Sequence, residues 1–310
     1  MAKKRSRRKE PSSGNYDMGH SSTQYLVQAL VNASQAGMKG DFARCTRICR
    51  KALEKADPTK DGRLWAALKH TLANSLGSDL GDGPEKNLEE AVSCYLEALS
   101  QTTRFSAPLV WASIHNNLAT AYTKRIKGDR EDNLDRAIFH CLEALKERRR
   151  ESTPLDWATT QNNLGSAYAD RQRGDRAENL ESAIHCFYQA SELRSREKFP
   201  HDWALIQYNL GRAYHDRLYG DRAENIEKSI NYYSSALKVR TRKSNPAEWA
   251  STHYRLGLAY KDRRMGCELE NRRKAIRSFR NALKVHKFGG EPTIVEKIKE
   301  EIEELQPKSQ

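Results

Sequence analysis

The sequence predicts an all-α protein built from repeated helix pairs. Its five tryptophans stand 46 residues apart, at Trp65, Trp111, Trp157, Trp203 and Trp249. The chain is rich in Ala, Leu, Glu, Lys and Arg and shows little alternation of β-branched residues, which favours helices over strands. Hydrophobic residues make up 37% and charged residues 31% of its 310 residues. This low apolar fraction provides only a thin core, which suits a solenoid because each repeat buries a face only against its neighbours.

The residues that follow each tryptophan recur with it. A Leu stands seven positions later, Ala or Gly eight positions later, and Tyr eleven positions later in the last four units. Asn stands 22 positions later in all five units, at Asn87, Asn133, Asn179, Asn225 and Asn271. Self-similarity at a fixed period is typical of repeat architectures.

Each unit divides into two helices, called helix A and helix B. In the third unit Thr153 and Pro154 predict the start of helix A, with the Thr hydroxyl as cap and Pro in the first turn. The helix is expected to run to about Arg173, where Gly174 allows a left-handed stop. Asn179, or Asp175 together with Glu178, is expected to open helix B. The small residue of helix A and a recurrent Ala in helix B predict a close approach of the two helices.

These patterns predict the organisation of the chain. Residues 1–21 are expected to form a disordered basic tail, and residues 22–60 a degenerate helix pair without the tryptophan. Five repeats are expected at 61–106, 107–152, 153–198, 199–244 and 245–288. Residues 289–310 are expected to form a capping helix and a tail.

The motif W…NNLG-x-AY, with its helix-B partner A…F, resembles the tetratricopeptide repeat (TPR). The longer form NNLG-x-AY-x-x-R-x-x-GDRAEN-[LI]-E is similar to the TPR arrays that accompany CHAT (caspase-like) domains, and the NLG helices are also similar to kinesin-light-chain repeats. The resemblance covers about residues 62–286. It implies a right-handed superhelical solenoid of about six antiparallel helix pairs plus a capping helix. It also implies protein partners, among them extended peptides or a separately encoded effector such as a protease.

The resemblance further implies that one face of the A helices lines a concave groove. Asn117, Asn163 and Asn209 occupy this face in successive units. An amide offers a donor and an acceptor, which matches the backbone of an extended peptide. The other residues assigned to this predicted site are Asn116, Asn162, Tyr208, Arg212, Tyr254, Arg255 and Lys124. The alternative is that the amides bond to the adjacent helix or to water and bind no ligand.

Two sets of arginines recur. Arg125, Arg171, Arg217 and Arg263 stand near the ends of the A helices and predict a structural ion pair or carbonyl cap with the acidic hinge at Asp129, Asp175 and Asp221. The clusters ERRRES (147–152), RSREK (194–198) and RTRKS (240–244) close the B helices, where basic residues are favoured by the helix dipole. They are expected to be solvated and to form a basic stripe.

The net charge of +13 offers an alternative function. The basic N-terminal tail and the helix-B ends could bind nucleic acid, RNA in particular, although no aromatic-rich RNA-binding motif or zinc-finger spacing is present. Self-assembly through the ends of the array is a third hypothesis.

The sequence contains no motif of a phosphate-binding loop, a nucleophile elbow or a metal-binding helix. We therefore expect no enzyme, no cofactor and no metal site. The six cysteines show no paired spacing, which predicts buried thiols in a reducing compartment. A soluble cytoplasmic protein without a membrane span is expected, nuclear if the tail acts as a targeting signal in a eukaryote. The predicted function is a non-enzymatic protein-interaction scaffold that holds an extended peptide in its groove.

Overall fold

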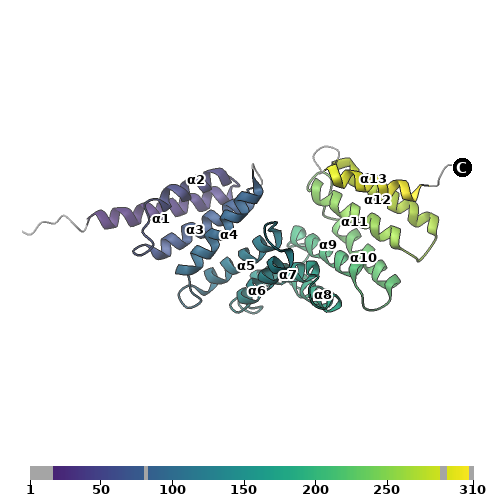
Figure 1. The fold of residues 1–310 in the computed structure, drawn as a ribbon, viewed down its shortest axis with the longest axis horizontal. Helices are drawn as coiled ribbons and strands as arrows, with labels where there is room; N and C mark the ends of the chain where they lie inside the picture. Colours follow the sequence, from purple (N-terminus) through teal and green to yellow (C-terminus); the bar gives the residue numbers. More distant parts are fainter. Residues whose placement is uncertain (1–16, 80–82, 287–291, 307–310) are drawn as a thin grey trace, which may run out of the picture. The chain divides into compact units, whose positions relative to one another are not determined.

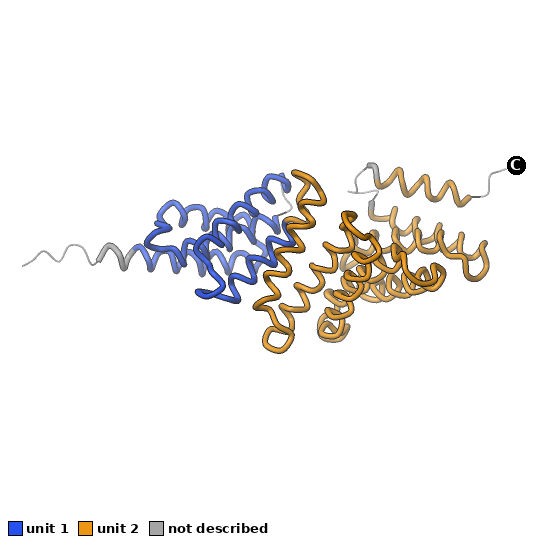
Figure 2. Tube along the Cα trace, turned by 60° about the horizontal axis from the view of Figure 1, so that its bottom comes forward, with its two compact units in different colours: residues 1–121 blue, residues 122–310 orange. Residues whose placement is uncertain are grey.

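The structure is a computed structural model that describes residues 17–79, 83–286 and 292–306. These residues form helices joined by turns and contain no strand. The chain divides into two compact units, residues 1–121 and residues 122–310 (Figure 2). Most of the tail predicted at 1–21 lies outside the described residues, and the first helix begins at Asp17.

The first unit contains two helix pairs and most of a further A helix (Figure 1). Its helices are α1 (Asp17–Met38), α2 (Phe42–Leu53), α3 (Gly62–Ser78), α4 (Pro84–Gln101) and α5 (Pro108–Lys124). The degenerate pair without tryptophan corresponds to α1 and α2, which pack on each other and on α3.

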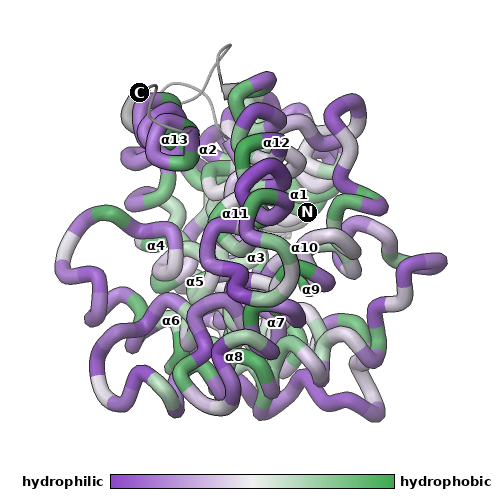
Figure 3. Tube along the Cα trace, turned by 90° about the vertical axis from the view of Figure 1, so that its right-hand side faces the viewer, coloured by the Kyte–Doolittle hydropathy of each residue, from purple (hydrophilic) through white to green (hydrophobic). Residues whose placement is uncertain are grey.

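The second unit continues the same alternation of A and B helices (Figure 1). Its helices are α6 (Arg130–Leu145), α7 (Pro154–Asp170), α8 (Arg176–Ser191), α9 (Pro200–Asp216), α10 (Arg222–Ala236), α11 (Pro246–Asp262), α12 (Glu268–His286) and α13 (Pro292–Leu305). The pairs α7–α8, α9–α10 and α11–α12 pack tightly within each repeat. Hydrophilic and hydrophobic residues alternate around these helices, as expected where one face is buried (Figure 3). The all-α solenoid fold is therefore as predicted.

The ends of the helices differ from the prediction in two places. Helix α7 ends at Asp170, three residues before the expected end, and Arg171 has an extended backbone. The Thr153 hydroxyl does not cap α7 but donates to the carbonyl oxygen of Arg149 (3.3 Å) in the preceding turn. Asp175 caps α8 as predicted, because its carboxylate accepts the backbone N–H groups of Ala177 and Glu178 (2.8 and 3.1 Å). Gly174 has φ +80°, a left-handed conformation that suits the hinge.

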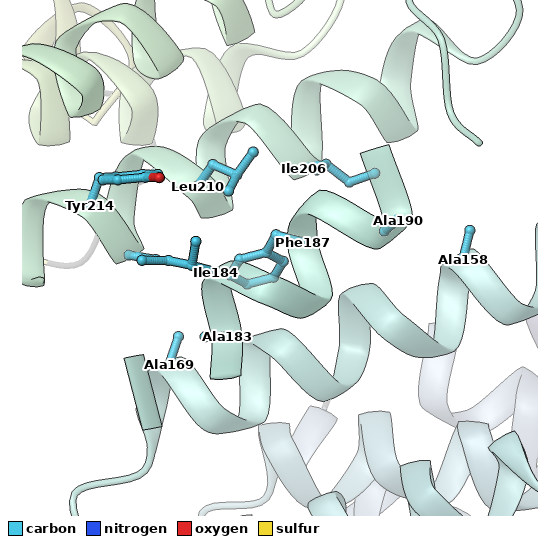
Figure 4. Packing of buried hydrophobic residues seen from close by; sticks show 10 residues of the cluster. Ala158, Ala169, Ala183, Ile184, Phe187, Ala190, Ile206, Leu210 and Tyr214 are labelled. Atoms are coloured by element: carbon cyan, nitrogen blue, oxygen red, sulfur yellow. The ribbon is translucent and has the colours of Figure 1, made fainter. Parts of the chain in front are cut away.

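The core of the third and fourth repeats is formed by α7, α8 and α9 (Figure 4). Ile184 and Phe187 of α8 pack against Leu210 of α9, and Ala183 and Ala190 lie beside them. All five are at least 95% buried. Burying large apolar side chains in this way is the main favourable contribution to folding.

The small residue of helix A has a steric cause. A Cβ at Gly165 would lie 2.7 Å from the ring of Phe187, and one at Gly211 would lie 2.7 Å from the ring of Tyr233. At Gly257 the distance to Phe279 would be 2.6 Å. The helix-B ring thus rests directly on the helix-A backbone in three successive repeats.

Helix α13 occupies the register of a further helix A. Pro292 follows Pro246 by 46 residues, and Ile302 takes the place of Leu256. Ile298 and Ile302 pack against Phe279 of α12. The position of Gly257, however, is taken by Glu303, which is exposed. A side chain at this position prevents a ring from resting on the backbone of α13 as it does on that of α11.

We predict that Gly211→Ala lowers the free energy of unfolding by about 1–3 kcal/mol, because the new methyl group overlaps the Tyr233 ring. Urea unfolding followed by circular dichroism measures the change. Gly77→Ala is the control, since a Cβ at Gly77 of α3 meets no atom within 4 Å. There the higher helix propensity of Ala should leave stability unchanged or slightly raised. Equal behaviour of both variants would contradict the close-approach explanation.

Candidate functional site

The predicted amides of the first unit contact the adjacent A helix. Asn117 of α5 donates to the side-chain oxygen of Asn74 of α3 (2.8 Å), and its amide nitrogen lies 3.4 Å from Nε2 of His70. Asn116 is buried and donates to the side-chain oxygen of Asn117 (3.2 Å). These amides therefore join neighbouring repeats.

The amides of the second unit make the same kind of contact. Asn209 of α9 donates to the side-chain oxygen of Asn162 (3.0 Å) and lies 3.4 Å from the hydroxyl of Ser166, both on α7. Asn209 is only 6% exposed and Asn162 only 9% exposed. The expectation of an open row of amides is thus corrected for Asn209, and the two predicted neighbours of the row, Asn116 and Asn162, are buried as well. Asn163 is half-buried and remains closer to the surface.

Of the two predicted tyrosines, Tyr208 contacts the next repeat and Tyr254 contacts helix B of its own repeat. The hydroxyl of Tyr208 lies 3.1 Å from that of Ser251 on α11, and the guanidinium of Arg240 stacks on the Tyr208 ring at 4.6 Å. The Tyr254 ring lies 5.9 Å from that of Phe279. Both residues are half-buried.

Charged groups line the C-terminal ends of the A helices in the second unit. Asp170 of α7 forms ion pairs with Arg212 of α9 and with Arg130 of α6 (3.1 Å for the latter). Burial alone would lower the pKa of Arg212, but attraction to Asp170 outweighs it and the pKa is raised. Arg212 is therefore a fixed cation that links α7 and α9.

The next contact of this kind is made by a histidine. Nδ1 of His215 lies 3.3 Å from Asp216, and Nε2 lies 3.1 Å from Asp262 at the end of α11. Burial tends to lower the pKa of His215, yet hydrogen bonds to the two carboxylates dominate and raise it. In its protonated form this side chain links the end of α9 to that of α11.

The remaining predicted residues lie near this row. Arg255 of α11 is half-buried. Burial tends to raise the pKa of Asp216, but the hydrogen bond from His215 outweighs this effect and lowers it, and the charge of Arg255 lowers it further. Lys124, the last residue of α5, is exposed. We name Asp170, Arg212, Asp216, Arg255 and Asp262 the inner charged row. Sequence analysis missed His215, because the same position is Ala169 and Lys261 in the neighbouring repeats and shows no periodic signal.

The recurrent hinge arginines form ion pairs, although with a partner other than the predicted hinge. Nε of Arg171, Arg217 and Arg263 donates to Asp135, Glu181 and Glu227 respectively, on helix B of the preceding repeat (2.7, 2.6 and 2.5 Å). Nη1 of each donates to the Asn at the start of its own helix B, for example Arg171 to Asn179 (3.2 Å). Each arginine thus connects two repeats and one hinge.

The first arginine of each basic cluster is not part of a solvated stripe. Arg148 and Arg240 are 7% and 3% exposed, and each donates to a Thr of the next helix A, Thr160 (2.9 Å) and Thr252 (3.1 Å). Arg194 pairs with Asp202 (2.7 Å) in the same way. Burial lowers the pKa of Arg148 and Arg240. The predicted basic stripe therefore loses one arginine per repeat to the connection between repeats.

No group of His, Cys, Asp or Glu that could hold a metal ion is found among the described residues. Five cysteines are buried and Cys267 is exposed, and all six are free thiols. Among the helices described, none combines the length and apolar character needed to cross a membrane.

We predict an interaction energy of about 1 kcal/mol between Arg217 and Glu181, because two guanidinium nitrogens donate to the carboxylate (2.6 and 2.8 Å). A double-mutant cycle of Arg217→Ala and Glu181→Ala, measured by urea unfolding, gives this energy. A cycle of the unconnected pair Arg217→Ala and Glu197→Ala serves as control. Additive effects in the Arg217–Glu181 cycle would show that the pair contributes nothing to stability.

We also predict a pH dependence that stems from His215. Because its pKa is raised in the folded state, its stabilising effect is fully present below the unfolded pKa of about 6.5 and is lost as pH rises through the folded value. His215→Asn should thus lower the free energy of unfolding more at about pH 6, below the reference pKa of about 6.5, than at about pH 9. The same substitution at the exposed His201 serves as the control. A difference independent of pH would refute the role of the imidazolium.

Comparison with known proteins agrees with this architecture. Three stretches, residues 73–102, 158–195 and 205–238, match the family model of the Sel1 repeat. Each covers part of a helix A and the whole of the following helix B. No curated protein sequence matches the chain.

One solved structure is similar over almost the whole chain. It is a chain from the crystal structure of the APC/C hetero-tetramer Cut9-Hcn1, with a TM-score of 0.61 and 15% identity. The match covers 95% of this chain and 47% of that one, so the present chain spans about half of its length. At this identity the likeness concerns the fold alone. Together with the Sel1 matches, it agrees with an all-α solenoid built from repeated helix pairs.

Proposed function

We propose that the protein is a non-enzymatic scaffold that binds an extended segment of a partner protein along the inner faces of its A helices. The observation that carries the proposal is the inner charged row. Its carboxylates and guanidiniums recur in α7, α9 and α11, and all of them keep part of their surface open to solvent.

The inner charged row suits a peptide ligand for a physical reason. Side chains fixed by ion pairs lose little further freedom when a ligand binds, which reduces the entropic cost of association. A half-exposed carboxylate that accepts one ion pair retains other lone pairs, and these can accept backbone N–H groups of an extended chain. Half-buried Asn163 and the exposed Leu205 of α9 provide amide and apolar contacts on the same set of helices.

The enclosed amides change the mechanism that the sequence predicted. Asn209 and Asn162 would support the groove from behind, by fixing the spacing of α7 and α9, rather than touch the ligand. Asn163, Tyr208, Arg212, Tyr254, Arg255 and Lys124 remain the proposed contact residues in the second unit, and Asn117 is a separate candidate in the first unit. The solved relative is described as a complex of Cut9 with Hcn1, which supports a protein as the partner. A separately encoded effector, as in CHAT-associated arrays, is one form that such a partner could take.

Binding of RNA is the second candidate, and the structure favours it less. The tail on which it depends lies within residues 1–16, outside the described residues. Arg148, Arg194 and Arg240 are engaged in contacts with the next repeat. Other cations of these clusters, among them Arg149 and Lys198, are exposed and would carry this function.

We predict that Asn163→Ala combined with Arg255→Ala reduces partner capture from a native cell extract at least about tenfold, through the loss of roughly 1–2 kcal/mol of binding energy. Quantitative mass spectrometry of the captured proteins gives the ratio. Asn231→Ala combined with Lys238→Ala is the matched control, because it removes an exposed amide from α10 and an exposed cation from the turn that follows it. Binding along the inner faces would be refuted if the control variant reduced capture, or if neither variant did.

A further inference from the structure

The outer face of α12 carries a row of cations that the rest of the fold does not use. Four exposed residues, Arg273, Arg277, Arg280 and Lys284, follow one another at steps of four, three and four residues. These steps place them on one side of the helix, opposite the buried Ala275, Phe279 and Ala282. The row is about 16 Å long at the rise of an α-helix. We name it the α12 basic stripe.

The stripe has no carboxylate partner within the described part of the chain. The neighbouring cations Arg272 and Lys274 are neutralised by Glu268 (2.9 Å) and Glu270 (2.7 Å), each four residues earlier. In the stripe, the residue four positions after Arg273 is Arg277, and the residue four positions after Arg280 is Lys284. Like charges at this spacing repel and destabilise a helix. An anion bound along the stripe would relieve that repulsion.

The same positions in the other B helices serve different ends. The position of Arg273 is occupied by Asp135, Glu181 and Glu227 in the preceding repeats, and each of these accepts a hinge arginine from the next repeat. The remaining three positions carry no more than one cation in α6, α8 or α10. The stripe is therefore a local feature of α12 and not a consequence of the repeat. Arg242 extends it, because its guanidinium lies 3.5 Å from the carbonyl oxygen of Lys284.

We infer that the α12 basic stripe is a docking site for an acidic α-helical segment of a partner protein. A helix that carries Glu or Asp at the same steps of four, three and four presents its carboxylates in one row, and guanidiniums bind carboxylates through two parallel hydrogen bonds. This inference rests on the proposed function in taking the ligand to be a protein, but it places the ligand on the outer face of a helix B instead of the inner charged row.

The surroundings of the stripe favour an acidic helix over a nucleic acid. The stripe contains no aromatic residue on which a base could stack. Helix α13, which packs on α12, exposes Glu296, Glu300 and Glu303. Those carboxylates would repel a nucleic acid whose phosphate backbone extended from α12 over α13. A single helix that lies along the stripe does not have to extend over α13.

The test uses the full-length protein and two synthetic alanine-based helical peptides of identical composition. In the striped peptide four Glu residues stand at steps of four, three and four, and in the scattered peptide they are distributed around the helix. At low ionic strength, fluorescence anisotropy should show that the striped peptide binds at least about tenfold more tightly. Arg277→Glu combined with Arg280→Glu should abolish this preference and weaken binding at least about tenfold, because two attractions become repulsions.

Arg149→Glu combined with Lys198→Glu is the matched control. It changes the net charge by the same amount at exposed positions of the second unit, and it should preserve the preference for the striped peptide. Circular dichroism verifies that each variant is folded. Equal binding of both peptides, or equal losses in both variants, would overturn the inference in favour of non-specific charge attraction. Tighter, stripe-dependent binding of a uridine dodecamer would overturn it in favour of RNA. The capture experiment with Asn163 and Arg255 is independent, so the two proposals can fail separately.

Discussion

The contact between an aromatic ring of helix B and the bare backbone of helix A is the constraint on which the repeats depend. In three successive repeats, a Cβ on the helix-A glycine would lie within 2.7 Å of the ring. The ring can approach so closely only because glycine has no side chain. This contact fixes the distance and the rotation of the two helices. The spacing of the Leu, Tyr and Ala residues around it, which recurs from repeat to repeat, follows from that geometry.

Contacts between successive repeats combine apolar packing, such as that of Ile184 and Phe187 against Leu210, with a set of polar contacts. Hinge arginines reach back to a carboxylate of the preceding helix B, while the arginines at the ends of the B helices reach forward to the next helix A. The amide of Asn209 and the imidazole of His215 connect neighbouring A helices. A half-buried ion pair contributes modestly to stability, but several directional contacts per repeat fix the register of one repeat on the next. This accounts for a chain that is nearly one-third charged and still builds a regular array.

The inner charged row and the α12 basic stripe differ in how their charges are arranged. Along the inner charged row Arg212 is paired with Asp170 of the adjacent A helix, and the three carboxylates and two guanidiniums of the row nearly balance in charge. On the outer face of α12 the cations stand beside one another without acids. The first arrangement suits a ligand recognised through its backbone, and the second suits a ligand recognised through its charge. Both surfaces lie within residues 122–310.

Residue spacing alone determined the all-α repeat fold, the pairing of helices and the close approach at the small residue. These features depend on local periodicity and on steric size, which are visible in a single repeat of the sequence. The direction of polar side chains was decided by tertiary structure. Asn209 and Arg148 belong to residue types that are usually solvated, and their burial results from a neighbouring repeat that supplies a partner at hydrogen-bond distance. The sequence identified Arg171 as structural but named the wrong acid, because Asp135 lies 36 residues earlier in the chain and becomes adjacent only when two repeats stack.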